Sequence, residues 1–118
     1  MTPWIADWLR AFALTVLTET CVALPLLAAV EPRLARRAEA ILLVNLASHP
    51  LVWFVGPALA LPYAQRLGIS EAWALLAELG AYLAIWPALG ARRAAIVSLC
   101  ANGASFAVGV ALRRLGLL

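Results

Sequence analysis

The chain has 118 residues, of which 65% are hydrophobic and 13% are charged. Soluble domains carry about 25% charged residues, and a soluble core of this length could not hide so much apolar surface. The composition therefore excludes a soluble domain and favours a membrane protein. The nine basic residues are all arginines and leave a net charge of +3. We expect them at the ends of membrane spans, in contact with lipid headgroups and not with nucleic acid.

Four apolar stretches predict the spans, at residues 8–30, 40–61, 71–89 and 94–112. Each has about the 20 residues that a helix needs to cross the bilayer core. Because the links between them are short, neighbouring spans should run antiparallel. We therefore predict an all-α fold, an integral membrane four-helix bundle that forms one transmembrane domain over residues 1–118.

The links follow from local signals. Residues 31–37 contain a proline and three arginines, and residues 62–68 form a second turn. Ser70 and Glu71 are typical of the N-cap and the acidic first turn of a helix, so they should begin the third span. We expect Cys21 and Cys100, which fall inside spans, to be buried free thiols.

The arginines also bear on orientation. The first and third links carry five of them, and the side of the two termini carries four. Because cytoplasmic loops are enriched in basic residues, this difference of one charge favours termini outside the cell. A composition rich in Ala, Leu and Arg is typical of GC-rich bacterial genomes, so we expect the bacterial cytoplasmic (inner) membrane.

An internal repeat relates the two halves of the chain. The sequence Asn-Leu-Ala-Ser at residues 45–48 returns as Asn-Gly-Ala-Ser at residues 102–105, and Glu19 is matched by Glu78. The sequence thus predicts two repeated transmembrane hairpins, each with a glutamate and an Asn-x-Ala-Ser segment. Because each hairpin has an even number of spans, a pseudo-two-fold axis along the membrane normal should relate them.

A polar side chain lies near the middle of each span. With ~1.5 Å rise per residue, Glu19, His49 and Asn102 lie roughly 12–15 Å into their helices. Lipid offers no hydrogen bonds, so we expect these polar stripes to face one another. The candidate substrate- or ion-binding residues are Glu19, Asn45, His49, Glu78 and Asn102. The candidate supporting residues are Ser48, Tyr82, Ser98 and Ser105, of which Tyr82 is expected to be a packed aromatic with a satisfied hydroxyl.

Three chemistries could use such a centre. Glu19 and Glu78, facing each other, could bind a proton as a coupled pair. Glu19, His49 and Glu78 could instead hold a divalent metal ion, since imidazole and carboxylate suit Zn, Mn or Fe. Thirdly, the Glu, Asn and Ser side chains could hydrogen-bond a neutral or cationic substrate. Apart from that metal ion, no cofactor is expected.

The leading functional hypothesis is ion- or proton-coupled transport by a homo-oligomer or by one subunit of a larger membrane assembly. An Ala-rich bundle should enclose little volume, enough for an ion or a proton. An accessory or structural subunit is the alternative, in which the polar residues only lock the helices together. A third hypothesis is an intramembrane metal-dependent enzyme, although the sequence favours a protein that is not an enzyme.

Overall fold

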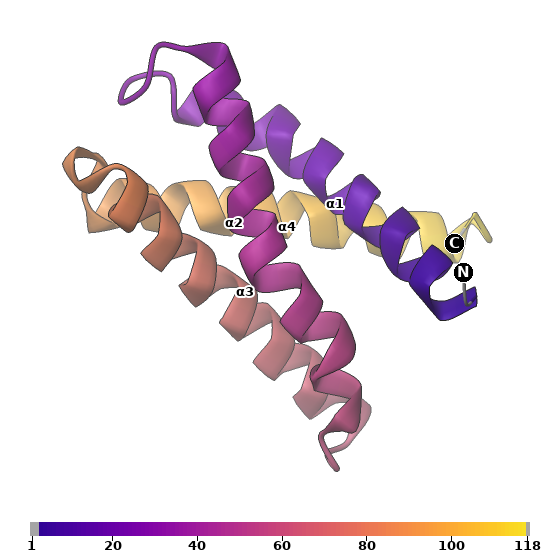
Figure 1. Cartoon of the computed structure of the whole chain (residues 1–118). Coiled ribbons are helices and arrows are strands. Elements are labelled where there is room, and N and C mark those ends of the chain that lie inside the picture. Colours follow the sequence, from indigo (N-terminus) through magenta and orange to yellow (C-terminus); the bar gives the residue numbers. More distant parts are fainter. Residues whose placement is uncertain (1–2, 118) are drawn as a thin grey trace.

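The computed structural model describes residues 3–117, and within that range the chain contains helices and no strand. Its elements are α1 (Pro3–Leu26), α2 (Leu34–Phe54), α3 (Tyr63–Ile85) and α4 (Ala91–Arg114), with two short 3-10 helices, η1 (Gly56–Ala58) and η2 (Pro87–Leu89). Figure 1 shows how these elements follow one another. The prediction of an all-α fold with four long helices is confirmed.

All four helices are long and apolar enough to cross a membrane. They contain between 21 and 24 residues, which corresponds to about 32–36 Å at ~1.5 Å per residue. A bilayer core is about 30 Å thick, so each helix reaches from one interface to the other. The protein thus has the four spans of an integral membrane protein.

The start of the third span differs from the prediction. α3 begins at Tyr63, directly after Pro62 in an extended conformation (φ −54°, ψ 147°), so Ser70 and Glu71 lie in its third turn and cap nothing. The predicted turn at residues 62–68 is helical because nothing after Pro62 stops a helix. The glycine at position 68 costs only about 1 kcal/mol relative to alanine, which tertiary packing can offset.

The other ends are also shifted. α1 begins and ends earlier than the predicted span 8–30, and α2 begins six residues before the predicted residue 40 and ends at Phe54, short of 61. α4 extends the predicted span 94–112 by a few residues at each end. The residues added at the start of α2 and at both ends of α4 include arginines. Arginine is a good helix former, so these helices continue beyond their apolar stretches into the headgroup region.

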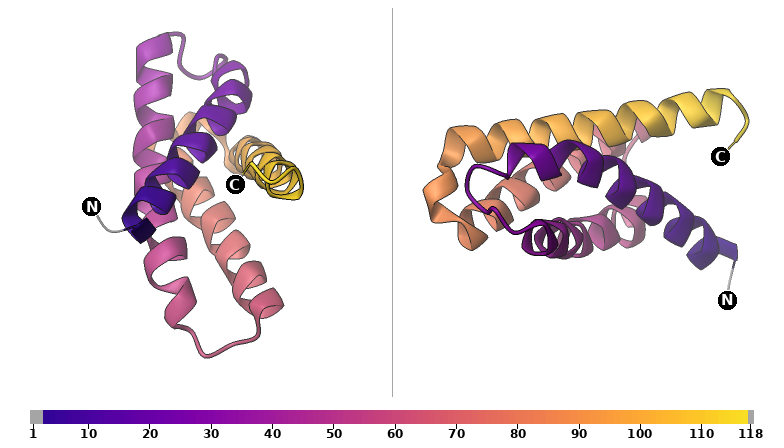
Figure 2. Two further views of the ribbon diagram at one scale, coloured as in Figure 1. Left: turned by 90° about the vertical axis from the view of Figure 1, so that its right-hand side faces the viewer. Right: turned by 90° about the horizontal axis from the view of Figure 1, so that it is seen from above.

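The helices pack in a ring, in which each contacts the next along the chain and α4 returns to α1. They converge where residues 27–33 and 86–90 connect them, which we call the closed end (Figures 1 and 2). They spread apart at the opposite end, which holds both ends of the described chain and residues 55–62; we call this the open end. The apolar core fills the closed end and consists of Ala23, Leu27, Ile41, Val44, Tyr82, Leu89, Ala94, Val97 and Ala101.

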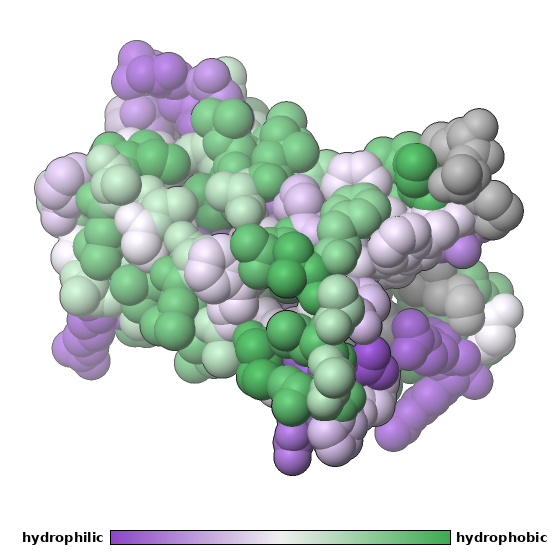
Figure 3. Space-filling model, turned by 60° about the horizontal axis from the view of Figure 1, so that its bottom comes forward, coloured by the Kyte–Doolittle hydropathy of each residue, from purple (hydrophilic) through white to green (hydrophobic). Residues whose placement is uncertain are grey.

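The face of the molecule shown in Figure 3 is apolar over much of its area. Leucines such as Leu17, Leu76 and Leu99 are more than 60% exposed, as expected for side chains that face lipid tails. Cys21 and Cys100 are free thiols but lie exposed on this surface, so the prediction that they are buried is wrong. Their helix faces look outward because the polar faces of α1 and α4 take the interior.

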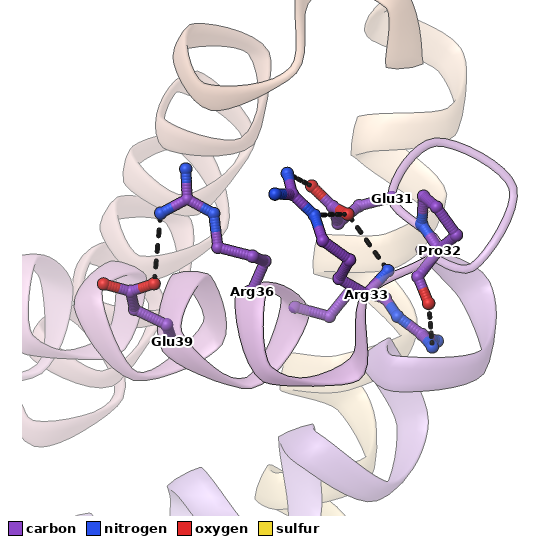
Figure 4. A network of polar contacts seen from close by, with 6 residues as sticks. Glu31, Pro32, Arg33, Arg36 and Glu39 are labelled. Carbon is purple, nitrogen blue, oxygen red and sulfur yellow. Dashed lines mark hydrogen bonds and ion pairs between the residues drawn. The ribbon is translucent and has the colours of Figure 1, made fainter.

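The link between α1 and α2 is held by an ion pair (Figure 4). Glu31 is 7% exposed, and its carboxylate accepts hydrogen bonds from the backbone N–H and from Nε and Nη2 of Arg33 at 2.9–3.0 Å. These bonds lower the pKa of Glu31 to about 2 and raise the pKa of Arg33. Nearby, Arg37 donates to the carbonyl oxygens of Leu24 and Pro32 and so closes the end of α1.

This ion pair should make stability depend on acid pH. The pKa of Glu31 in the folded protein lies below its ordinary value of 4.5. The pair therefore stabilises the folded state above about pH 4.5, and this contribution is lost as the pH falls towards 2. We expect Glu31→Gln to lower the melting temperature in detergent at pH 7, with the difference from the natural chain vanishing near pH 2.

The matched control is Glu39→Gln, because Glu39 pairs with Arg36 at 3.4 Å with both side chains exposed. An exposed pair contributes little, so the melting temperature of this variant should follow that of the natural chain at every pH. A difference for Glu31→Gln that stays constant down to pH 2 would contradict the assignment.

Candidate functional site

Two glutamates lie inside the bundle with almost no exposed surface. Glu19 on α1 is 0% exposed and Glu78 on α3 is 1% exposed. Each lies seven residues before the last residue of its helix, which is about 10 Å from the closed end. The two carboxyl groups therefore lie at matching depths, on the closed side of the middle of their helices.

The carboxylate of Glu19 accepts hydrogen bonds from two other helices. Asn45 Nδ2 on α2 donates to Oε2 at 2.7 Å, and Ser105 Oγ on α4 donates to Oε1 at 3.1 Å. Both oxygens of the buried carboxylate thus have a partner, which is the condition for keeping such a group away from water. One partner belongs to the same hairpin, α1–α2, and the other belongs to the α3–α4 hairpin.

Glu78 has a corresponding set of donors. Asn102 Nδ2 on α4 donates to Oε2 at 2.5 Å, and Ser48 Oγ on α2 donates to Oε1 at 3.5 Å. Ser98 Oγ adds a third contact, to Oε2 at 3.3 Å. We use the name glutamate layer for the two glutamates, the asparagine that each accepts from in its own hairpin, and the serine that each accepts from in the other hairpin. It comprises Glu19, Asn45, Ser48, Glu78, Asn102 and Ser105.

The asparagines are oriented by their own helices. Asn45 Nδ2 also donates to the carbonyl of Ile41 at 3.1 Å, and Asn102 Nδ2 donates to the carbonyl of Ser98 at 3.0 Å. Each amide nitrogen therefore donates one hydrogen bond to the helix backbone and one to a glutamate. Asn45 Oδ1 is buried and has no hydrogen-bond partner within the described residues.

The two serines of the layer each have a choice of acceptor. Ser48 Oγ lies 3.5 Å from the carbonyl oxygen of Asn45, and Ser105 Oγ lies 3.0 Å from that of Asn102. A hydroxyl has one hydrogen, so it donates either to the glutamate or to this carbonyl. In the second case its oxygen is free to accept a hydrogen from a protonated carboxyl group. The layer can thus satisfy its glutamates in either protonation state.

A cavity of about 470 Å³ lies towards the open end and reaches the glutamate layer. Residues of all four helices line it, among them all six members of the layer and, beyond them, His49, Trp53, Tyr63, Glu71, Phe106, Arg113 and Arg114. Ligand pockets commonly measure about 300–1,000 Å³. The expectation that the bundle encloses little volume is therefore wrong, because the helices spread at the open end instead of packing along their whole length.

His49 lies outside the glutamate layer. Its Nδ1 accepts a hydrogen bond from Trp8 Nε1 at 3.1 Å, and its ring packs against Phe12 and Trp53 with centroids 5.3 and 6.2 Å apart. His49 is half-buried and lines the cavity above the layer as part of this aromatic cluster. The prediction that it shares one centre with the glutamates is not supported by these contacts.

The residues of the metal hypothesis are not assembled into one site. Among residues 3–117, no three His, Cys, Asp or Glu side chains lie close enough to hold a metal ion together. The oxygens of Glu19 and Glu78 accept hydrogen bonds from Asn and Ser side chains, and Nδ1 of His49 accepts one from Trp8. The geometry therefore favours the proton or substrate chemistries over metal coordination.

The two remaining supporting residues lie on the closed side of the layer. Ser98 is 0% exposed and contacts both Glu78 and the carbonyl of Leu75. Tyr82 is also 0% exposed and stacks on Trp86, with ring centroids 6.4 Å apart. Its hydroxyl has no hydrogen-bond partner among the described residues, so the prediction of a satisfied hydroxyl is wrong. The core residues around it are apolar.

Glu71 is a cavity residue that is not among the candidate site residues predicted from the sequence. It is expected in the acidic first turn of the third span, but it lies inside α3 and lines the cavity. The available signal was its spacing of seven residues from Glu78, since residues two helical turns apart share one face.

No family model matches the chain, and the comparisons found no similar curated protein and no similar solved structure. The function of the site therefore has to be inferred from its own geometry.

The contact between Asn45 and Glu19 should be measurable as a coupling. We expect Asn45→Leu to lower the free energy of unfolding by about 1–3 kcal/mol, because it leaves a buried carboxylate oxygen without a donor. In a Glu19→Leu background the same substitution should cost less, since the carboxylate is gone. Unfolding in detergent of the four chains of this double-mutant cycle provides the test. Equal costs in both backgrounds would contradict the contact.

Proposed function

We propose that the protein is an ion- or proton-coupled membrane transporter in which Glu19 and Glu78 bind the coupling proton or cation. The observation that carries the proposal is a pair of buried glutamates at the floor of a cavity that reaches them from the open end. Ionisable groups at bilayer depth are costly and are mostly retained for ion or proton pathways. In this assignment Asn45 and Asn102 orient the two carboxyl groups, and His49 lies along the route from the open end.

We further propose that the two hairpins are repeats related by a pseudo-two-fold axis along the membrane normal. Three observations support this. Each glutamate lies seven residues before the end of its helix, and each asparagine lies eleven residues after the start of its helix. Each glutamate also accepts from the asparagine of its own hairpin and from a serine of the other. The layer would then hold two equivalent carboxyl sites.

Proton binding in this layer has a simple route. A protonated carboxyl group donates its hydrogen to the oxygen of its serine partner, and the serine turns its own hydrogen to the asparagine carbonyl. All groups stay hydrogen-bonded, while the charge of the layer changes by one unit. In a medium of low dielectric constant such a change acts strongly on any charged substrate in the same cavity, which is the physical basis for coupling.

The wider setting of the proposal follows from the sequence. The chain would function in the bacterial inner membrane as a homo-oligomer or as one subunit of a larger membrane assembly. Both termini would lie outside, because links one and three carry five arginines and the other side carries four.

A second candidate function is that of an accessory or structural membrane subunit. The observation in its favour is that all four oxygens of Glu19 and Glu78 already have protein partners. A layer that is complete without a ligand needs no further role than to lock four helices together. The intramembrane metal-dependent enzyme is the least favoured hypothesis, because Glu19, His49 and Glu78 do not form one group.

Substitution of both glutamates separates the first two functions. We expect the double variant Glu19→Gln with Glu78→Gln to reduce proton flux into proteoliposomes at least tenfold, because glutamine keeps the hydrogen-bonding shape but cannot bind a proton. Flux is followed with an enclosed pH-sensitive dye under an imposed membrane potential. Glu39→Gln, which removes an exposed carboxylate far from the layer, is the control and should leave flux unchanged.

The size of the purified particle is measured alongside. Flux that is lost while the particle keeps its size supports transport. Flux that equals that of the natural chain, with a particle that dissociates more readily, overturns transport in favour of the structural role.

A further inference from the structure

Glu71 has no obvious structural purpose. It lies within a membrane span, is half-buried, and makes no hydrogen bond or ion pair with any residue in the described range 3–117. The glutamates of the layer, by contrast, have donors for every oxygen. A carboxylate at this depth needs a counter-charge or hydrogen-bond donors, and residues 3–117 supply neither. Its partner is therefore to be sought outside the chain.

The surroundings of Glu71 define what that partner could be. The seven residues between Glu71 and Glu78 place Glu71 about 10 Å above the glutamate layer, towards the open end. The cavity there is lined by aromatic and aliphatic side chains, including Trp53, Tyr63 and Phe106. A metal cation would need several oxygen ligands around it. Aromatic walls instead suit the apolar body of an organic cation, whose charge they also attract.

A second cavity reaches the same carboxylate. It has a volume of about 260 Å³, lies between α3 and α4, and is lined by Glu71, Asn102 and Phe106 together with Leu75, Leu99 and Gly103. Leu99 and Gly103 are exposed on the outer surface of α4, where lipid tails would lie. Glu71 thus borders both the cavity of about 470 Å³, which we call the main cavity, and this second, mostly apolar cavity. The position suits a ligand with an apolar part.

The carboxylate of Glu71 also decides which kind of organic cation fits. Because its oxygens accept no hydrogen bond from residues 3–117, the matching ligand carries N–H donors. This distinguishes a protonated amine from a quaternary ammonium ion, which has no such donor.

We propose that the main cavity is the binding site for a small organic amine in its ammonium form, with Glu71 as the anionic anchor. This assigns the substrate class and rests on the proposed transport function. The other ionisable side chains on this cavity are Glu19, His49, Tyr63, Glu78, Arg113 and Arg114. The two arginines lie in the last turn of α4, at the mouth, and neither pairs with Glu71. They discourage a second cation, so the site takes one monovalent ligand.

Binding to the purified full-length chain in detergent tests the proposal. The probes are 2-phenylethylammonium and 2-phenylethanol, which share one carbon skeleton and differ in charge. By titration calorimetry at pH 7 we expect the ammonium ion to bind at least tenfold more tightly than the alcohol. Glu71→Gln should reduce its affinity to that of the alcohol. The matched control Glu39→Gln removes a carboxylate outside both cavities and should change neither affinity.

Two results would overturn the site: equal binding of both probes by the natural chain, or unchanged ammonium affinity in Glu71→Gln. Particle size and helical circular dichroism show whether that variant folds. If it does not, Glu71→Asp replaces it, and this variant should keep a weaker preference for the ammonium ion; loss of the preference in a folded Glu71→Asp chain would sink the site.

The outcome is independent of the transport experiment. Loss of proton flux on replacing Glu19 and Glu78, without any preference for the ammonium probe, would refute only the substrate class. If the preference for the ammonium probe depends on Glu71, but proton flux is unchanged when Glu19 and Glu78 are replaced, coupled transport is refuted. The amine site is then still supported.

Discussion

The structure depends on where two carboxyl groups inside an apolar bundle obtain their hydrogen bonds. Lipid tails offer none, so a buried glutamate must be satisfied by neighbouring helices. Glu19 on α1 accepts from Asn45 on α2 and Ser105 on α4, while Glu78 on α3 accepts from Asn102 on α4 and Ser48 on α2. These four contacts join every pair of neighbouring helices in the ring. No helix can leave the bundle or rotate far without stripping a buried carboxylate of a donor.

Around this layer the bundle divides into two unlike halves. On the closed side, small residues such as Ala23, Ala94 and Ala101 let the helices approach one another around an apolar core. On the open side the helices spread (Figure 2). A cavity with ionisable and aromatic walls reaches from there to the layer. A proton or ligand therefore has a route to the glutamates from the open end. This asymmetry favours the proposed transport function over a purely structural one, since locking four helices together requires no cavity.

Much of this arrangement could be predicted from the residues alone. The four helices follow from apolar length, and the inward position of Glu19 and Glu78 follows from the cost of exposing a carboxylate to lipid. The asparagines and serines were predicted as partners for the same reason. The predictions of a satisfied Tyr82 hydroxyl and of two buried cysteines were wrong, and the contacts of His49 do not support its place beside the glutamates. The reason is that polarity alone does not say which neighbour a side chain contacts. Tyr82 points into an apolar core, and Cys21 and Cys100 point outward.

The sequence by itself determined the number of helices and the presence of one polar stripe on each, since both depend on local length and periodicity. Only the tertiary structure decided the pairing of donors with carboxylates, because that depends on how far each helix is rotated and tilted against the next. The bond between Trp8 and His49, 41 residues apart, holds the histidine in an aromatic cluster on the cavity wall. The spreading of the helices turned a mid-helix Glu71 into a cavity residue. Such effects arise from crossing angles between helices, which no segment of the chain encodes alone.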